Sequence, residues 1–235
     1  MDFYTDWNCR LLPTLSNQKQ AATECLSSLS SLHEIHGFDR FCLIRVYDGS
    51  NHSLPIFLLE QRILKDHLMA SSPRQLSVCF ATPALLYEGL SEEAELERLL
   101  LPHHNCLPLL MPTGAYQEWM DTELNRLLYK RHIRLLFLSF ELNAVFYPSE
   151  VLARLLRVPE AVYQFNFRAF TDPRLTSYIK TLLSDHATVL LGTGLDQREK
   201  IYFYEQSHYL DCIRSALTPM EYQLLLHGNQ SFWRS

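Results

Sequence analysis

The sequence predicts an α/β fold in which a mixed or largely parallel sheet carries helices on both faces. Short apolar runs alternate with longer amphipathic segments along most of the 235 residues, which is typical of strand–helix–strand units. Hydrophobic residues make up 47% and charged residues 20% of the chain, as in an ordinary globular protein. No internal repeat or low-complexity linker interrupts the pattern, so one continuous α/β domain is expected.

The first 36 residues differ from the rest and predict an N-terminal helical segment. Leu26, Leu29, Leu32 and Ile35 recur at a spacing of three among Ser, Gln and Thr, which gives a narrow apolar stripe on a helix, and Gly37 suits the helix C-terminus. We therefore divide the chain into residues 1–36, an N-terminal helical segment, and residues 37–235, the α/β domain.

Strands and helices are expected in alternation across the second region. The strands are predicted over 41–47, 76–80, 106–110, 133–140, 162–170, 189–191 and 201–204, and the helices over 54–69, from 91 onward, 115–130, 148–157, 172–184 and 218–227. Pro102 and Pro108 predict that the strand over 106–110 is an edge strand or an irregular one. The run over 162–170 alternates with a period of two, which predicts a strand with one polar face.

The junction between that strand and the next helix carries the most specific local chemistry. Asp172 before Pro173 predicts an N-cap followed by the first helical residue. Arg174 places a cation in the first turn, against the helix dipole, so it needs a partner. We expect Arg168, Asp172 and Arg174 to act as one unit, either an internal ionic lock or a partner-binding site.

The familiar signatures of hydrolases and nucleotide-binding enzymes are missing. The sequence holds no GxSxG, GxxxxGK[ST] or HExxH motif. The segment Gly192-Thr193-Gly194 resembles the start of a dinucleotide loop but has no third glycine, which favours a tight turn between strands. We therefore expect no catalytic residue, no cofactor and no enzymatic turnover.

Two histidine clusters are candidate metal sites. His103, His104 and Cys106 would need further ligands from elsewhere, and His33 and His36 fit a solvated helix face as well as a chelate. No metal is therefore expected at either cluster.

An ordered series of motifs resembles a known family, the type VI secretion effector adaptors or chaperones, also called domain of unknown function 4123. The series comprises Tyr47-Asp48-Gly49, Leu85-Leu86-Tyr87-Glu88-Gly89-Leu90, the acidic run 92–96, the strand 106–110, Trp119, Leu138-Ser139, the helix 151–156, Phe167-Arg168-Ala169-Phe170-Thr171-Asp172-Pro173-Arg174, Leu191-Gly192 and Leu217-Thr218 with 222–224. The hallmark segment has one extra residue before Asp-Pro-Arg, and the apolar strand lacks the family's glycine.

The resemblance implies a non-catalytic cytoplasmic adaptor that binds one toxic effector polypeptide and helps to load it onto the VgrG spike protein. An adaptor needs an apolar or aromatic face for its partner. The residues expected to bind the partner or to carry the family motif are Tyr87, Glu88, Phe165, Phe167, Arg168, Phe170, Asp172, Pro173 and Arg174.

Charge and cysteine usage agree with a cytoplasmic protein. The net charge is −5, so no general basic field attracts nucleic acid or anionic lipid, and we expect neither as a partner. The amino terminus is acidic, and the most apolar stretch, 133–140, is too short to span a bilayer. The six cysteines include no CxxC pair, which favours reduced thiols.

Two other functions stay open at this point. One is a degenerate receiver-like or nucleotide-binding signalling domain, with Asp48 as the acid at a strand end, although Tyr47-Asp48-Gly49 also fits a turn. The other is a small metal-dependent enzyme that uses His103, His104 and Cys106.

Overall fold

The computed structural model describes residues 5–12, 18–49, 53–73, 75–102, 104–195 and 205–234. Its strands are β1 (Thr5–Cys9), β2 (Arg40–Ile44), β3 (Ser77–Ala81), β4 (Ala84–Leu85), β5 (Cys106–Leu110), β6 (Arg134–Phe137), β7 (Val162–Asn166) and β8 (Thr188–Gly192). Its helices are α1 (Gln18–His36), α2 (Leu54–Ser71), α3 (Glu118–Asn125), α4 (Phe140–Phe146), α5 (Ser149–Leu155), α6 (Pro173–Ser184), α7 (Gln206–Ala216) and α8 (Pro219–Arg234). Short helical turns lie at η2 (Leu90–Glu92), η3 (Leu96–Leu99), η4 (Arg126–Lys130) and η5 (Phe167–Thr171).

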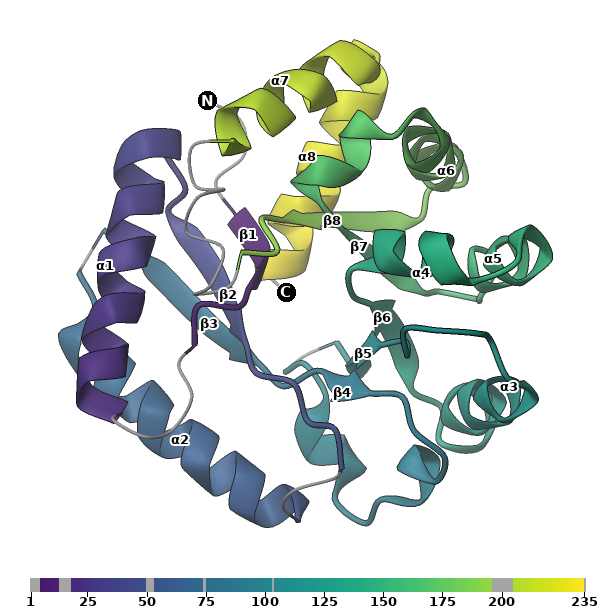
Figure 1. The fold of residues 1–235 in the computed structure, drawn as a ribbon, viewed down its shortest axis with the longest axis horizontal. Helices are drawn as coiled ribbons and strands as arrows, with labels where there is room; N and C mark the ends of the chain where they lie inside the picture. The colour runs from purple at the N-terminus through teal and green to yellow at the C-terminus, as the bar shows by residue number, and fades with distance from the viewer. Residues whose placement is uncertain are drawn as a thin grey trace.

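The strands form a closed parallel barrel with helices around its outside (Figure 1). Strands β1, β2 and β3 pair in that order, as do β4 to β8, and every paired strand runs parallel. Only Thr82 and Pro83 separate β3 from β4, and Ala84 pairs with Tyr47 beyond the end of β2. Strands β3 and β4 are therefore two halves of one bent strand, and the described part of the barrel has seven strands.

The barrel closes where β8 meets β1. The Gly194 N–H donates to the Asn8 carbonyl at 2.9 Å, and the Arg10 N–H donates to the Leu195 carbonyl at 2.8 Å. A Cβ on Gly192 would lie 2.5 Å from the Asn8 backbone nitrogen, so only glycine allows this approach. Gly194 has a φ of +66°, and a Cβ there would clash with the Asn166 side-chain amide. These two glycines allow the close approach that closes the barrel between β8 and β1.

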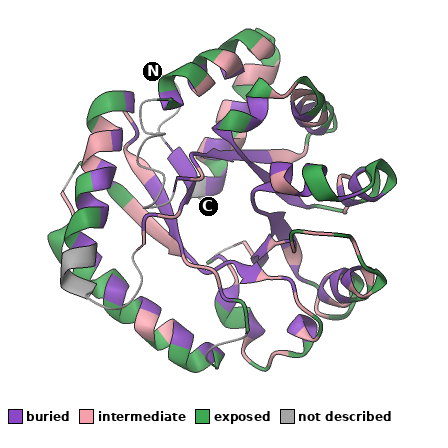
Figure 2. Ribbon diagram, viewed as in Figure 1, coloured by how far each residue is buried: buried purple, intermediate pink, exposed green. Residues whose placement is uncertain are grey.

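Two apolar cores lie on the two sides of the barrel wall. The larger fills the space between strands and helices, so each helix is buried along its inner side and exposed along its outer side (Figure 2). The smaller lies inside the barrel and consists of Trp7, Cys42, Ile44, Ala81, Leu101, Cys106, Leu136, Leu138, Val162, Leu190 and Phe232. Phe232 of α8 packs edge-on against Trp7, with ring centroids 5.3 Å apart, and α8 thereby covers the N-terminal end of the barrel.

The predicted α/β class with parallel strands is confirmed. Because the sheet curls into a barrel, the helices cover its outer surface and side chains fill its interior. The helix predicted before Gly37 is α1, but residues 5–9 form a strand that pairs with β2 and bonds to the segment after β8. Strand β1 and helix α1 are thus the first unit of the barrel rather than a separate segment. The strand predicted over 201–204 lies outside the described residues.

None of the described helices combines the length and the apolar character that crossing a bilayer requires.

Candidate functional site at the C-terminal mouth of the barrel

Polar side chains gather where β1, β6, β7 and β8 end. In barrels of parallel strands and helices this is the end that carries active sites, because the loops after the strands meet there. We call this set the mouth cluster, and its members are Asp6, Asn8, Arg10, Ser139, Glu141, Gln164, Asn166 and Thr193. All except Arg10 are buried, and Arg10 is partly exposed.

Asn8 is the centre of the mouth cluster. Its Nδ2 lies 2.8 Å from Ser139 Oγ, 3.0 Å from Gln164 Oε1 and 3.0 Å from Asn166 Oδ1. One side chain of β1 therefore joins strand β7 and the turn after β6. A buried amide needs such partners, since leaving it without them costs about 1–3 kcal/mol.

Arg10 brings a permanent positive charge to the mouth. Its Nε donates to Asn8 Oδ1 at 3.2 Å, and its Nη2 donates to Ser139 Oγ at 3.0 Å. These bonds hold the planar guanidinium against the network. A guanidinium held in this way matches carboxylate and phosphate groups, which it can bind through two N–H groups at once.

Ser139 stands on a sharp turn from β6 into α4. Its backbone is left-handed, with φ 49° and ψ 45°, which is uncommon for a residue with a side chain. The backbone N–H of Ser139 donates to Gln164 Oε1 at 2.8 Å and holds the turn in place. Strained residues of this kind cluster at functional sites.

Asp6 joins β1 to the residue that follows β8. Its Oδ1 accepts from the backbone N–H of Asn8 at 3.0 Å and of Thr193 at 2.9 Å, and its Oδ2 accepts from the Thr193 hydroxyl at 2.6 Å. Burial raises the pKa of Asp6 even though these bonds oppose the shift. Both carboxylate oxygens are therefore used in closing the barrel.

Glu141 is the second buried acid of the mouth. Its Oε2 accepts from the Asn166 N–H at 3.3 Å, while its Oε1 has no hydrogen-bond partner among the described residues. Burial raises the pKa of Glu141, and the charges of Arg168 and Arg10 oppose that shift. Burial thus favours the protonated form of Glu141, and one of its oxygens has no bond among the described residues that would oppose this.

A smaller polar group lies on the other side of the barrel, beyond β2 and β4. The hydroxyls of Tyr47 and Tyr87 both donate to Glu93 Oε1, at 3.2 Å and 2.7 Å. Burial, followed by the neighbouring Glu93, raises the pKa of both tyrosines. The group anchors the turn at Asp48 and Gly49, and a Cβ on Gly49 would lie 2.9 Å from the Tyr87 ring.

The predicted junction of strand and helix is present only in part. Asp172 caps α6, since its Oδ1 accepts from the Arg174 N–H at 2.8 Å, and Pro173 opens the helix. The Arg174 guanidinium is 3.8 Å from Asp172 Oδ2 and more than half exposed. Arg168 is exposed on η5 and acts electrostatically on Glu141. The cap is confirmed, but no contact among the described residues joins Arg168 to Asp172.

The aromatic residues expected on a partner-binding face are buried. Phe165 packs beside Phe140 with ring centroids 5.7 Å apart, and Phe167 stacks on Phe38 at 5.6 Å. Phe170 is 6% exposed. These rings fill the core between barrel and helices, so they cannot form a displayed aromatic face. Of the two remaining motif residues, Glu88 is exposed and Tyr87 is the Glu93 partner already described.

The described members of the two histidine clusters do not come together as metal sites. His104 stacks on Phe232 with centroids 4.0 Å apart, and Cys106 is buried in the barrel interior, while His103 lies outside the described residues. The ring of His33 bonds to the Phe38 carbonyl at 2.8 Å, and that of His36 lies 3.2 Å from the Ser207 hydroxyl. Across the described residues, no three His, Cys, Asp or Glu side chains come together to hold a metal ion.

The comparisons identify a fold but no family. No family profile and no curated protein matches the chain. A solved structure described among the metal-dependent tyrosine phosphatases YwqE from Bacillus subtilis and CpsB from Streptococcus pneumoniae has a TM-score of 0.62 and 13% sequence identity. The likeness covers 96% of this chain and 95% of the other. At this identity it shows a shared fold.

This likeness contradicts the adaptor interpretation of the sequence. Over 96% of its length the chain shares its fold with a metal-dependent tyrosine phosphatase, so the resemblance to type VI adaptors was wrong, and the expectation of a non-catalytic adaptor loses its basis. The motif series misled because each piece is a short strand end, turn or helix cap that many α/β folds share. The predicted effector and VgrG partners depended on that resemblance, and nothing in the structure tests them.

The mouth cluster does not fit the metal that the related fold implies. Both carboxylate oxygens of Asp6 accept hydrogen bonds from Thr193 that close the barrel. The side-chain oxygens of Gln164 and Asn166 accept from the Asn8 amide and do not face an open position. Arg10 adds a fixed cation beside them. A divalent ion needs oxygen or nitrogen ligands that converge on it, and a nearby positive charge weakens its binding. The donor set therefore favours an anion in place of a metal.

Proposed function

We propose that this chain acts on a phosphate monoester at the C-terminal mouth of its barrel, with Arg10 supplying the positive charge. The observation that carries the proposal is the Arg10 guanidinium, held between Asn8 and Ser139 at the end where barrels of this type do their chemistry. An aryl phosphate is the substrate class, because the similar solved structure is that of a tyrosine phosphatase.

Arg10 matches the phosphate in charge and in geometry. A phosphate monoester is an anion near neutral pH, and its oxygens accept the parallel N–H groups of a guanidinium. Because the mouth is largely buried, the attraction is screened less than at an open surface. Arg10 would therefore bind the substrate and stabilise the charge on the phosphoryl oxygens during transfer.

Glu141 is the group suited to protonate the departing oxygen. Hydrolysis adds water to phosphorus while the bond to the leaving oxygen breaks, and that oxygen takes up a proton. Burial favours the protonated form of Glu141, and its Oε1 has no hydrogen-bond partner among the described residues. An acid held protonated by its surroundings is a typical general acid.

The experiment is hydrolysis of p-nitrophenyl phosphate in the presence of EDTA. We expect the wild-type chain to release p-nitrophenol under these conditions and Arg10→Gln to lower kcat/KM by about 100-fold, as for loss of one charge-stabilising donor. The matched control is Arg134→Gln, because Arg134 lies at the start of β6, at the opposite end of the barrel. The control should keep kcat/KM within about twofold of wild type.

Two results would overturn the proposal. One is activity that EDTA abolishes and a divalent ion restores, since the mouth would then hold a metal. The other is a folded chain that neither hydrolyses the ester nor binds inorganic phosphate.

A further inference from the structure

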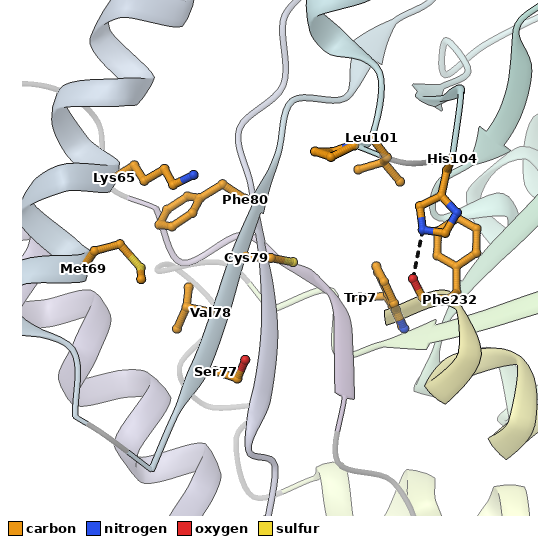
Figure 3. Close-up of a pocket in the computed structure, with 11 residues that line it drawn as sticks. Trp7, Lys65, Met69, Ser77, Val78, Cys79, Phe80, Leu101, His104 and Phe232 are labelled. Carbon is orange, nitrogen blue, oxygen red and sulfur yellow. Dashed lines mark hydrogen bonds between the residues drawn. The ribbon is translucent and has the colours of Figure 1, made fainter. Parts of the chain in front are cut away.

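A second cavity lies at the opposite, N-terminal end of the barrel and belongs to none of the groups above. Its volume is about 380 Å³, within the size range of small-molecule sites. It is lined by Trp7, Lys65, Met69, Ser77, Val78, Cys79, Phe80, Leu101, Pro102, His104 and Phe232 (Figure 3).

The cavity lies at a gap in the barrel wall beside β3. The ring of strands closes through β4, which pairs with β5 at Leu109 and Leu110, but β3 itself pairs with β2 and with no strand on its other side among the described residues. On the facing side of the gap, Cys106 of β5 bridges to Leu101. The Ser77 N–H donates to the Asp39 carbonyl on the β2 side. Since neighbouring residues of a strand turn their N–H and C=O groups to opposite edges, those of Val78 and Phe80 face the open edge. No strand of the described chain covers that edge.

Side chains of β3 reach both sides of the open edge. Figure 3 shows Cys79 pointing toward Trp7 and Phe232, inside the barrel, and Phe80 pointing toward Lys65 of α2. Lys65 Nζ lies 5.6 Å from the centre of the Phe80 ring. The cavity therefore runs from an aromatic compartment in the barrel interior, past backbone N–H groups, to a lysine at the surface.

The lining named above holds one permanent charge, that of Lys65. Its lining contains Lys65 and His104 but no aspartate or glutamate, and Lys65 has no ion pair within the described part of the chain. The rest of the lining is mostly apolar or aromatic. A ligand that complements this surface has an apolar body and one negative group.

We propose that this cavity binds a small amphipathic anion, an aromatic or aliphatic acid. Its apolar body lies against Trp7, Cys79 and Phe232, which line the inner part of the cavity, and its acid group lies at the open edge of β3, near Lys65. The site is at the other end of the barrel from Arg10, so it is independent of the phosphate-ester proposal.

The test uses 8-anilinonaphthalene-1-sulfonate, an aromatic sulfonate whose fluorescence rises in apolar surroundings. We expect one molecule to bind per chain and decanoate to displace it. Cys79→Phe fills the aromatic compartment and should weaken binding by about tenfold or more, whereas Cys212→Phe adds the same ring on α7, away from the cavity, and should leave it unchanged. Lys65→Gln should weaken binding about fivefold, and Lys130→Gln, on η4, should have no effect.

Each variant is checked by circular dichroism before titration. If Cys79→Phe does not fold, the lysine pair decides the question on its own. The proposal is overturned if Lys65→Gln and Lys130→Gln bind the probe alike, or if the cation 9-aminoacridine binds as tightly as the sulfonate. It is also overturned if folded Cys79→Phe binds like wild type.

Discussion

Replacing Asn8 by alanine tests whether the mouth cluster stabilises the barrel. The substitution removes the amide that joins β1 to Ser139, Gln164 and Asn166. Each of these acceptors keeps another donor: Ser139 Oγ keeps Arg10, Gln164 Oε1 keeps the Ser139 N–H, and Asn166 Oδ1 keeps Gln164 Nε2 at 3.2 Å. The penalty for wholly unsatisfied acceptors is therefore avoided.

The expected cost comes from the bonds themselves. The two N–H groups of the Asn8 amide account for about 1 kcal/mol each, and the lost acceptor of Arg10 Nε adds about 1 kcal/mol more. We expect Asn8→Ala to lower the free energy of unfolding by about 3 kcal/mol in urea denaturation followed by circular dichroism. Asn125→Ala is the control, because Asn125 is exposed at the end of α3, and it should change stability by less than about 0.5 kcal/mol. An Asn8→Ala variant as stable as this control, with an unchanged denaturant slope, would refute the reasoning.

Three further predictions use the same denaturation measurement. Gly192→Ala should cost about 1–3 kcal/mol, because its Cβ would lie 2.5 Å from a backbone nitrogen of β1, whereas Gly228→Ala in α8, with its nearest atom at 3.4 Å, should be neutral or stabilising. Asp172→Ala should cost about 1 kcal/mol through loss of the cap, and Arg174→Ala should change stability by less than that, since its ion pair is exposed. Glu141→Gln should gain stability relative to wild type as pH rises above about 4.5, because the raised pKa of Glu141 makes its ionisation costly in the folded chain; equal pH profiles for both proteins would contradict this.

The sequence predicts most elements because their signals are local. Apolar runs mark β2, β5 and β6, and Asp172-Pro173 marks the start of α6 without help from the rest of the fold. Strand β1 carries no such signal. Its residues Asp6 and Asn8 are polar because they bond to the mouth cluster and to the segment after β8, so they do not show the apolar alternation of a strand.

The mouth cluster escaped prediction because its residues belong to no catalytic motif. Gln164 and Asn166 do appear as the polar face of an alternating strand, but polar faces are usually solvated, whereas this one points into a closed barrel. Closure itself depends on contacts of Gly192 and Gly194 with β1, which lies more than 180 residues earlier in the sequence. No local sequence pattern encodes such a contact. Arg10 could have been singled out only after that closure was known.

The most direct test of the phosphate site is a crystal structure of the chain soaked with tungstate, a heavy analogue of phosphate. The anomalous signal of tungsten locates the ion. The account predicts one tungstate at the C-terminal mouth, with its oxygens within hydrogen-bond distance of the Arg10 guanidinium. A mouth without tungstate, or a metal ion bound among Asp6, Asn8 and Glu141, would contradict it.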